Sequence, residues 1–390
     1  MSPQPAPSLP LDGLVAAGYG KVADAFSTAL ARSTRGGAAL TVMVGGQKVV
    51  DLWGGAADAR DGRAWTQDTP SVTFSCSKGL LAVLVARLVE VGKIDLDTSV
   101  STYWPEFGQA GKETIPVRWL LSHQAGLSYP TEDITKADVL AWHPVVDKLA
   151  AQTPLWEPGT GHSYHAFTYG WLVGEVVRRV TGQSVGEAFA ELVAGPIGAR
   201  AWIGVPREEL SSVVVLAMAP DLDVDAMQLP PEFAPLKRAF TLGGAFPGTL
   251  AGEGTGLNDP DIQAAEVPGG GAVATARALA EIWSSTILPT SATQPLPLDV
   301  VTDMVQVQSS GQQILGPQGV PQPSWATGFM VDSPARPFLT SSSFGHDGAG
   351  GQLAFADPAL GVGFGFVTND AQGVGDIRAL DILDTLRRTL

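Results

Sequence analysis

Cysteine is almost absent from this sequence. One of the 390 residues is a cysteine, Cys76, so the chain cannot form an internal disulfide bond. No histidine lies close to Cys76 in the sequence to activate it as a nucleophile. We therefore expect Cys76 to be a small buried residue that packs like an apolar side chain.

Positive charge is also scarce. Lysine and arginine together number 24, against 39 aspartates and glutamates, and the formal net charge is −15. No local cluster of basic residues reverses this balance, which argues against nucleic acid or an anionic membrane surface as a partner. Hydrophobic residues make up 45 % of the chain and charged residues 16 %, which favours a globular, enzyme-like protein and argues against a disordered chain.

Long apolar runs are missing as well. No stretch reaches the length needed to span a membrane. Residues 1–7 lack the basic and apolar segments of a secretion signal. We expect a soluble, cytoplasmic protein, and the sequence leaves its oligomeric state open.

Strand patterns lie near both ends of the chain, and helical patterns fill its middle. Residues 38–53 are predicted to form a hairpin with a Gly-Gly turn, and residues 351–367 to form a second hairpin. Apolar residues at helical spacing predict a helix over 13–32, and another helix is predicted over 376–390.

These patterns predict an α+β fold. Residues 1–80 and 270–390 would form an antiparallel sheet flanked by helices. Residues 81–269 would form an inserted, mainly helical domain with long irregular loops. The stretch 219–272 is rich in proline and glycine, and we expect it to form part of a pocket wall. The active site would lie in the cleft between the two domains.

A serine and a lysine three residues apart mark the predicted start of a helix. Ser75 follows an extended run and Lys78 lies one helical turn later, so both side chains would share one face. The lysine amine could then take the serine proton, and free N–H groups at the helix start could stabilise a developing oxyanion. A Ser-x-x-Lys pattern alone is weak, because it occurs by chance about once or twice in a chain of this size.

Two later segments supply possible partners for Ser75. Tyr164 follows a Pro-Gly turn and is predicted to open a helix over 163–181, from whose N-terminus its phenol could share in proton transfer. Residues 344–351 are rich in glycine, which permits a close approach of backbone to substrate. The N–H of Ala349, together with that of Ser75, could form an oxyanion hole.

Together these segments resemble a known family. Ser75–Lys78, Tyr164–Ala166 and His346–Gly348 fall in the order of the three motifs of serine β-lactamases and penicillin-binding proteins. The sequence is most similar to the class C β-lactamase-like branch, in particular to the family VIII carboxylesterases. The resemblance extends over roughly residues 15–385 and is weakest over 200–260.

The resemblance implies a fold and a set of roles. The fold would be the β-lactamase/transpeptidase-like architecture. Ser75 would be the nucleophile that forms an acyl-enzyme, with Lys78 and Tyr164 as the proton-transfer pair. The backbone amides of Ser75 and Ala349 would bind the oxyanion.

The sequence departs from the β-lactamase pattern at two positions. His346 stands where β-lactamases have the lysine of Lys-Thr-Gly, which helps to hold the substrate carboxylate. Ala166 stands where class C enzymes have the asparagine of Tyr-x-Asn, whose amide contacts the lactam side chain. Both changes remove β-lactam recognition and retain the acyl-transfer residues, which favours ester substrates.

Five residues are candidates for the substrate pocket. His346 would line the pocket or anchor the backbone, and Gly348 belongs to the same motif. Tyr129 and Trp156 would line an acyl pocket or pack in the core. His165 would contact the pocket or act as a structural hydrogen-bonding residue. His162 and His165 have no carboxylate or cysteine cluster beside them, so we predict neither a metal nor a cofactor.

The sequence therefore predicts a serine carboxylesterase that hydrolyses small carboxylic esters and has weak or no β-lactamase activity. One alternative is an acyltransferase of the same fold that passes the acyl group to an alcohol. Others are a true β-lactamase or D-amino-acid peptidase, and a catalytically silent binding module. The Gly-x-Ser-x-Gly pentapeptide of the α/β-hydrolases does not occur.

Overall fold

The central element is an antiparallel sheet in which the two ends of the chain meet. The computed structural model describes residues 11–227, 234–316, 318–373 and 375–390. Nine strands of this part of the chain form the sheet. Its order is β1 (Leu11–Val15), β3 (Gln47–Asp58), β2 (Gly37–Val44), β15 (Val362–Thr368), β14 (Gln352–Asp357), β13 (Phe344–Gly348), β12 (Met330–Val331) and β11 (Ser324–Trp325), with β4 (Arg63–Ala64) paired to β3.

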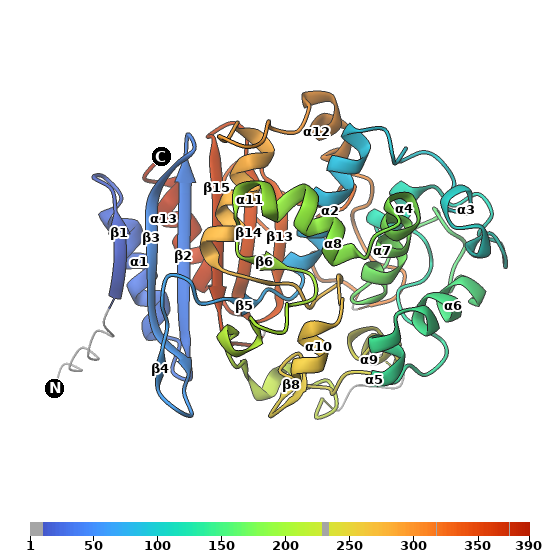
Figure 1. The fold of residues 1–390 in the computed structure, drawn as a ribbon, viewed down its shortest axis with the longest axis horizontal. Coiled ribbons are helices and arrows are strands. Elements are labelled where there is room, and N and C mark those ends of the chain that lie inside the picture. Colours follow the sequence, from blue (N-terminus) through green and yellow to red (C-terminus); the bar gives the residue numbers. More distant parts are fainter. Residues whose placement is uncertain (1–10, 228–233, 317, 374) are drawn as a thin grey trace.

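The first half of the sheet comes from the N-terminal region and the second half from the C-terminal region. They join where β2 pairs with β15, from Val44 opposite Val362 to Ala38 opposite Thr368. Both predicted hairpins are present, as β2–β3 and β14–β15. The predicted α+β fold with a sheet from both termini is confirmed (Figure 1).

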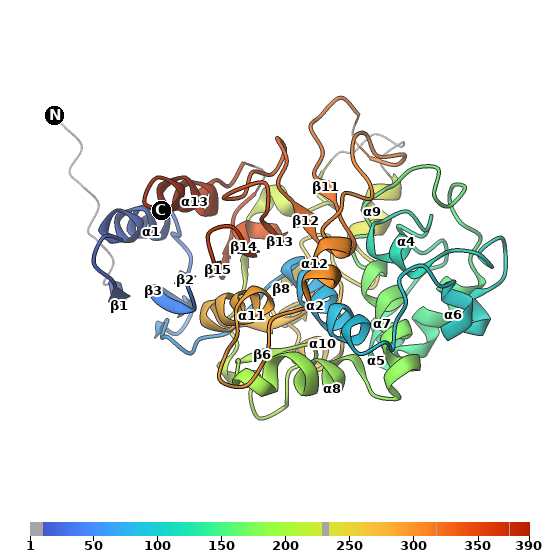
Figure 2. The same ribbon diagram turned by 90° about the horizontal axis from the view of Figure 1, so that it is seen from above.

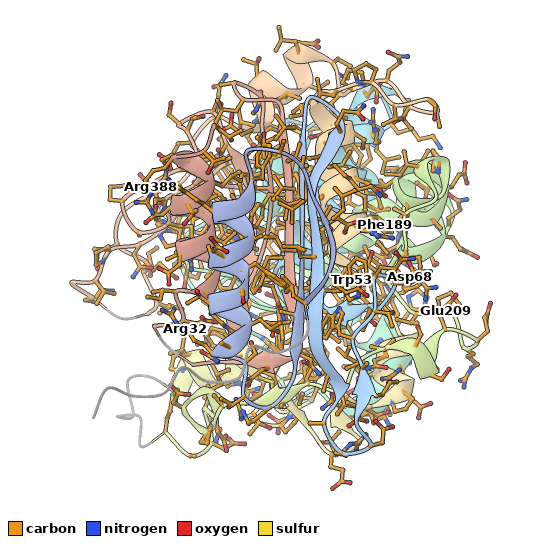
Figure 3. All side chains as sticks on the ribbon, turned by 90° about the vertical axis from the view of Figure 1, so that its left-hand side faces the viewer. Arg32, Trp53, Asp68, Phe189, Glu209 and Arg388 are labelled. Carbon is orange, nitrogen blue, oxygen red and sulfur yellow. The ribbon has the colours of Figure 1, made fainter. Side chains whose placement is uncertain are left out.

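Helices cover both faces of the sheet. One face carries α1 (Gly20–Ala31) and α13 (Arg378–Arg387), which lie side by side in Figure 3. The other face carries α11 (Ala276–Ile287), as Figure 2 shows from above. Each face has its own cluster of buried apolar side chains.

The sequence of β15 explains why the two faces differ. Val362, Phe364 and Phe366 alternate with glycines, and all three pack toward α1 and α13. The glycines face α11: a Cβ at Gly363 or Gly365 would lie 2.4 Å from a backbone oxygen of that helix. The missing side chains therefore let α11 pack directly on the sheet.

The middle of the chain is mainly helical. Its helices are α2 (Cys76–Glu90), α3 (Val100–Tyr103), α4 (Val117–Leu121), α5 (Lys136–Ala141), α6 (His143–Ala151), α7 (Thr168–Thr181), α8 (Val185–Phe189), α9 (Ala234–Phe240), α10 (Pro260–Ala264) and, later in the chain, α12 (Leu298–Met304). Three small sheets accompany them: β5 (Ser71–Val72) with β10 (Val273–Ala274) and β6 (Ala201–Trp202), β16 (Asp370–Ala371) with β7 (Ala217–Met218), and β8 (Ala251–Gly252) with β9 (Thr255–Gly256).

Helix α2 connects the sheet to the helical part. It contacts β13 on one side and α7 on the other, and nearly all of its residues are buried. The domain boundary expected between residues 80 and 81 falls inside this helix, so α2 belongs to both parts. The division of the chain into two domains stays a prediction.

The N-terminal region differs from the prediction. The helix expected over 13–32 begins at Gly20, and residues 11–15 form the edge strand β1. All five residues of β1 are exposed, so the strand is held by backbone pairing with β3 and not by a buried face. Apolar spacing alone could not show this. Among the residues described, no helix is both long and apolar enough to cross a membrane.

Arg378, at the start of α13, connects several distant segments. It is fully buried and pairs with Asp376 at 2.7 Å. The guanidinium also donates from Nη1 to Ser33 Oγ at 2.6 Å and from Nη2 to Gly350 O at 2.9 Å and Asp370 O at 2.8 Å. The end of α1, the loop after β13 and β16 are therefore held together by one side chain.

Replacing Arg378 with methionine should reduce the free energy of unfolding by about 3–5 kcal/mol, because Asp376 would remain buried without its cation. Arg32→Met is the matched control: Arg32 pairs with Asp381 at the surface, where such a pair contributes less than about 1 kcal/mol. Chemical denaturation measures both. Equal losses in the two variants would contradict this role of Arg378.

Candidate active site

Ser75 sits in a tight turn directly before α2. The preceding residue, Phe74, has a φ of +46°, which is rare for a non-glycine residue and is a strained conformation. Ser77 holds this turn: its hydroxyl donates to Phe74 O and accepts a hydrogen bond of 3.0 Å from Ala272 N. The turn and the segment at Ala272 therefore fix the position of Ser75.

Lys78 lies beside Ser75, as the three-residue spacing predicts. Its Nζ is 3.2 Å from Ser75 Oγ and donates at 2.6 Å to both Ala166 O and Gly269 O. Burial lowers the pKa of Lys78 to about 7, although the charge of Asp347 opposes the shift. A neutral amine fits these contacts: two N–H groups reach the two carbonyls, and the lone pair is left to face the serine hydroxyl.

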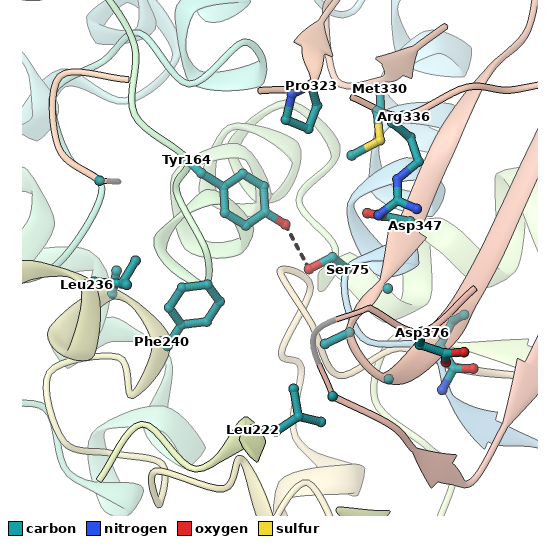
Figure 4. A pocket seen from close by; sticks show the side chains of 18 of the residues that line it. Ser75, Tyr164, Leu222, Leu236, Phe240, Pro323, Met330, Arg336, Asp347 and Asp376 are labelled. Atoms are coloured by element: carbon teal, nitrogen blue, oxygen red, sulfur yellow. Dashed lines mark hydrogen bonds and ion pairs between the residues drawn. The ribbon is translucent and has the colours of Figure 1, made fainter. Parts of the chain in front are cut away.

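Tyr164 is the third member of the cluster. Its Oη lies 2.8 Å from Ser75 Oγ, as the dashed line in Figure 4 shows, and Lys78 Nζ lies 4.7 Å from the centre of its ring. Burial raises the pKa of Tyr164, so the phenol keeps its proton at neutral pH. The structure therefore brings together all three residues predicted for proton transfer and nucleophilic attack.

The local structure around Tyr164 differs from the prediction. The helix expected over 163–181 begins at Thr168, so Tyr164 does not open a helix. Its segment forms backbone hydrogen bonds with distant segments instead: Ser163 N donates to His123 O at 3.1 Å, and Ile314 N donates to His162 O at 2.9 Å. The hydrogen-bonding groups of this backbone find their partners far away in the sequence. A local pattern of apolar residues cannot reveal such partners.

Several contacts hold the tyrosine in place. Its backbone N–H donates to Gln313 Oε1 at 2.8 Å, and the hydroxyl of Ser163 donates to Leu315 O at 2.7 Å. The ring stacks on Trp325, with centroids 5.1 Å apart and planes inclined by 21°. Neither Gln313 nor Trp325 was predicted from the sequence, because their segment carries no motif.

His165 is a structural residue and not part of the pocket wall. It is fully buried; its Nδ1 is 2.7 Å from Ser163 O, and its Nε2 accepts a hydrogen bond of 3.1 Å from Leu127 N. Its backbone N–H donates to His123 Nδ1 at 3.2 Å. These contacts fit a neutral ring protonated on Nδ1, and burial lowers the pKa of His165 to about 3.

His346 also lies behind the pocket wall. It is buried, and its Nδ1 is 2.6 Å from Asp347 O. The carbonyl of His346 accepts a hydrogen bond of 3.2 Å from Cys76 Sγ. Of the two roles considered for His346, the structure supports the backbone-anchoring role. Cys76 is buried, and burial raises the pKa of its thiol, which disfavours the reactive thiolate.

The end of β13 approaches Ser75 closely. A Cβ added at Gly348 would lie 2.4 Å from Thr73 O, so only a glycine lets the two segments approach this closely. The next residue, Ala349, lies on the wall of the cavity that also contains Ser75. This arrangement is compatible with the predicted pairing of the Ser75 and Ala349 amides, which stays a prediction.

A cavity of about 590 Å³ opens over Ser75 and Tyr164. Tyr129 and Gly348 belong to its wall, as expected, whereas His346, His165 and Trp156 do not. The α9 region lies opposite β13 (Figure 4), as expected from the 219–272 stretch. Most of the wall is apolar, through residues that include Leu222, Leu236, Phe240, Trp325, Met330 and Leu353.

Within the described parts of the chain, no group of three or more histidine, cysteine, aspartate or glutamate side chains could hold an ion. The side chains gathered at Ser75 are a serine hydroxyl, a lysine amine and a tyrosine phenol.

Comparisons with known proteins agree with this class of site. Residues 22–387 match the family model described as Beta-lactamase, and the chain belongs to that family. The chain is 33 % identical over 356 residues to the esterase/beta-lactamase LipL of Mycobacterium tuberculosis, covering 89 % of this chain and 80 % of LipL.

Solved structures of similar proteins share the fold of this chain. A family VIII carboxylesterase superposes with a TM-score of 0.85 at 33 % identity, covering 98 % of this chain and 100 % of the other. EstA from Arthrobacter nitroguajacolicus Rue61a superposes with a TM-score of 0.84 at 30 % identity, covering 96 % and 97 %. The predicted β-lactamase/transpeptidase-like fold is confirmed, and the chain is a serine hydrolase.

The buried neutral ring of His165 predicts a pH dependence of stability. Its pKa in the folded chain lies below the usual value of about 6.5 for an unfolded chain, so the unfolded state binds one more proton between these values. Stability contributed by the neutral ring is present above pH 6.5 and is lost as the pH falls.

His165→Gln can keep one donor and one acceptor but cannot titrate. Between pH 6 and 4.5, its free energy of unfolding should fall less steeply than that of the unchanged protein, by about 1 kcal/mol per pH unit. His143→Gln, at an exposed histidine, controls for the substitution itself. Identical slopes for His165→Gln and the unchanged protein, measured by denaturation, would refute this assignment.

Proposed function

We propose that the protein is a carboxylesterase that hydrolyses small carboxylic esters through an acyl-enzyme on Ser75. The main support is the geometry of Ser75, Lys78 and Tyr164 at the base of a largely apolar cavity. A serine hydroxyl needs a base to become a nucleophile, and a lysine with a pKa of about 7 can serve as one.

In the acylation step, neutral Lys78 takes the proton of the Ser75 hydroxyl. The Oγ atom then attacks the ester carbonyl carbon, and the negative charge moves to the carbonyl oxygen. The N–H groups of Ser75 and Ala349 would stabilise that charge, since fixed donors need no reorganisation as the charge develops. Apolar neighbours around the reacting atoms strengthen this stabilisation.

Collapse of the tetrahedral intermediate breaks the bond to the leaving alcohol, which needs a proton. Tyr164 Oη is the phenol closest to Ser75 Oγ and can give its proton to the alkoxide, while Lys78 returns one to Tyr164. In deacylation a water replaces the alcohol and gives its proton to the same pair. The acid leaves, and Ser75 regains its hydrogen.

Two positions favour esters over β-lactams. Ala166 has no side-chain amide with which to contact a lactam substituent, and its carbonyl is already occupied by Lys78. His346 is buried outside the cavity wall and is held neutral by burial, which lowers its pKa. Neither residue can supply the contacts that the β-lactamase motifs provide.

A substrate panel should therefore show ester hydrolysis with little lactam hydrolysis. We expect kcat/KM for p-nitrophenyl butyrate to exceed that for a chromogenic cephalosporin by roughly a hundredfold. Ser75→Ala should abolish both activities, while Ser341→Ala, at an exposed serine, should retain them.

Methanol added to the ester assay separates hydrolysis from acyl transfer, and free butyrate should remain the main product. A dominant methyl ester would favour the acyltransferase alternative. Faster turnover of the cephalosporin than of the esters would contradict the proposed substrate class.

Lys78 should determine the pH dependence of ester hydrolysis. Because only its neutral form can accept the serine proton, kcat/KM should rise with pH through about 7 and fall below it. Lys78→Arg, which stays protonated, should lower kcat/KM at least about a hundredfold at every pH.

Lys112 provides a matched control. It is also buried, burial likewise lowers its pKa, and its Nζ donates to Gln152 O at 2.6 Å. Lys112→Met should keep the rising limb near pH 7. Full activity of Lys78→Arg at neutral pH would exclude Lys78 as the base.

A further inference from the structure

An ion pair stands on the cavity wall close to Ser75. Asp347 extends from β13, and Arg336 extends from the loop between β12 and β13; their side chains form a close salt bridge. Figure 4 shows the pair on the side of the cavity opposite Phe240. The side chains remain 29 % and 21 % exposed for Arg336 and Asp347, so both are accessible from the cavity they line.

Asp347 neutralises the charge of Arg336, the cation that faces the cavity. Among the described residues of the wall, Arg336 is the one arginine or lysine, and its partner is Asp347. The other acidic wall residue, Asp376, is paired with Arg378, which is buried outside the wall. Lys78 is not part of the wall, and its Nζ donates to two carbonyl oxygens.

Asp347 is negatively charged in the resting site. Burial favours its neutral form, but His346, whose Nδ1 lies 3.6 Å from the carboxylate, and the charge of Arg336 outweigh that effect and hold its pKa below the usual value. Asp347 lies two residues before Ala349, and its charge acts on both Lys78 and Tyr164. A substrate that reaches Ser75 therefore meets a carboxylate close to its scissile bond.

We propose that the Arg336–Asp347 pair is the specificity determinant that restricts this site to esters without a carboxylate near the scissile bond. Asp347 repels a substrate carboxylate and also occupies the guanidinium that would otherwise bind it. This inference rests on the proposed esterase function and names its substrate class. The same repulsion would disfavour penams and cephems, whose fused rings carry a carboxylate, and peptides with a free C-terminal carboxylate.

Substitutions at Asp347 and Arg336 should have opposite effects on the hydrolysis of anionic esters. Asp347→Asn keeps the shape of the side chain, removes the negative charge and leaves the Arg336 guanidinium free to bind a carboxylate. Arg336→Gln leaves Asp347 without its cation, which increases the repulsion. Asp347→Glu retains the charge and the pairing.

Two matched substrate pairs test the proposal. p-Nitrophenyl hexanoate and mono-p-nitrophenyl adipate differ by a carboxylate on the acyl side. Phenyl butyrate and 4-carboxyphenyl butyrate differ by a carboxylate on the alcohol side. The readout is the ratio of kcat/KM for the neutral ester to that for the anionic ester, with KM and kcat determined separately and spontaneous hydrolysis subtracted.

For the unchanged protein we expect a ratio of at least about ten in one or both pairs, since like charges repel strongly in a poorly solvated cavity. Asp347→Asn should lower that ratio at least about tenfold, mainly through a lower KM for the anionic ester. Arg336→Gln should raise the ratio, and Asp347→Glu should restore it. Asp384→Asn, at an exposed aspartate away from the cavity, should leave it unchanged.

Equal turnover of neutral and anionic esters by the unchanged protein would overturn the proposal, as would an unchanged ratio in folded Asp347→Asn. If Asp347→Asn does not fold, the double variant Arg336→Gln/Asp347→Asn removes both charges and must also lose the discrimination. Failure of the proposed function gives a different result: no ester is hydrolysed faster than by Ser75→Ala, and this inference falls with it.

Discussion

In the proposed mechanism, the chemistry of the site depends on the desolvated amine of Lys78, which is fully buried. Desolvation favours the neutral form of Lys78 and brings its pKa to about 7, where it can accept a proton. Two backbone carbonyls, Ala166 O and Gly269 O, each accept a hydrogen bond from its Nζ. They come from segments about 90 and 190 residues later in the chain. The proposed base is therefore held by two distant segments of the chain, although it lies one helical turn from Ser75.

Strands β13 and β14 of the sheet form part of the cavity wall beside Ser75. The alternating glycines of β15 let α11 pack directly on one face, while the phenylalanines fill the other face under α1 and α13. At the end of β13, Gly348 lets the strand approach the turn that precedes Ser75. Arg378 then connects the adjoining loop to α1 and β16 through buried polar contacts. Stability and active-site geometry therefore rest on the same backbone segments.

The sequence contained enough information for the hairpins, the sheet from both termini and the Ser75–Lys78–Tyr164 cluster, because turn residues, alternation and motif spacing are local signals. It could not reveal the edge strand β1, because this strand has no buried face. It could not reveal the irregular segment of Tyr164 either, because the backbone hydrogen bonds of that segment are made with distant residues. His165 and His346 were candidates for the pocket wall because they belong to the second and third motifs of the resemblance. In the structure their hydrogen bonds with backbone groups place them behind that wall.

Reaction with a fluorophosphonate, followed by measurement of the intact mass and by peptide mapping, tests directly whether Ser75 is the nucleophile. Attack by the activated serine on phosphorus with loss of fluoride leaves a stable adduct. We expect one adduct per chain, on the peptide containing Ser75, and slower labelling as Lys78 becomes protonated below pH 7. An adduct on another residue, or ester hydrolysis that continues after Ser75 is fully labelled, would contradict it.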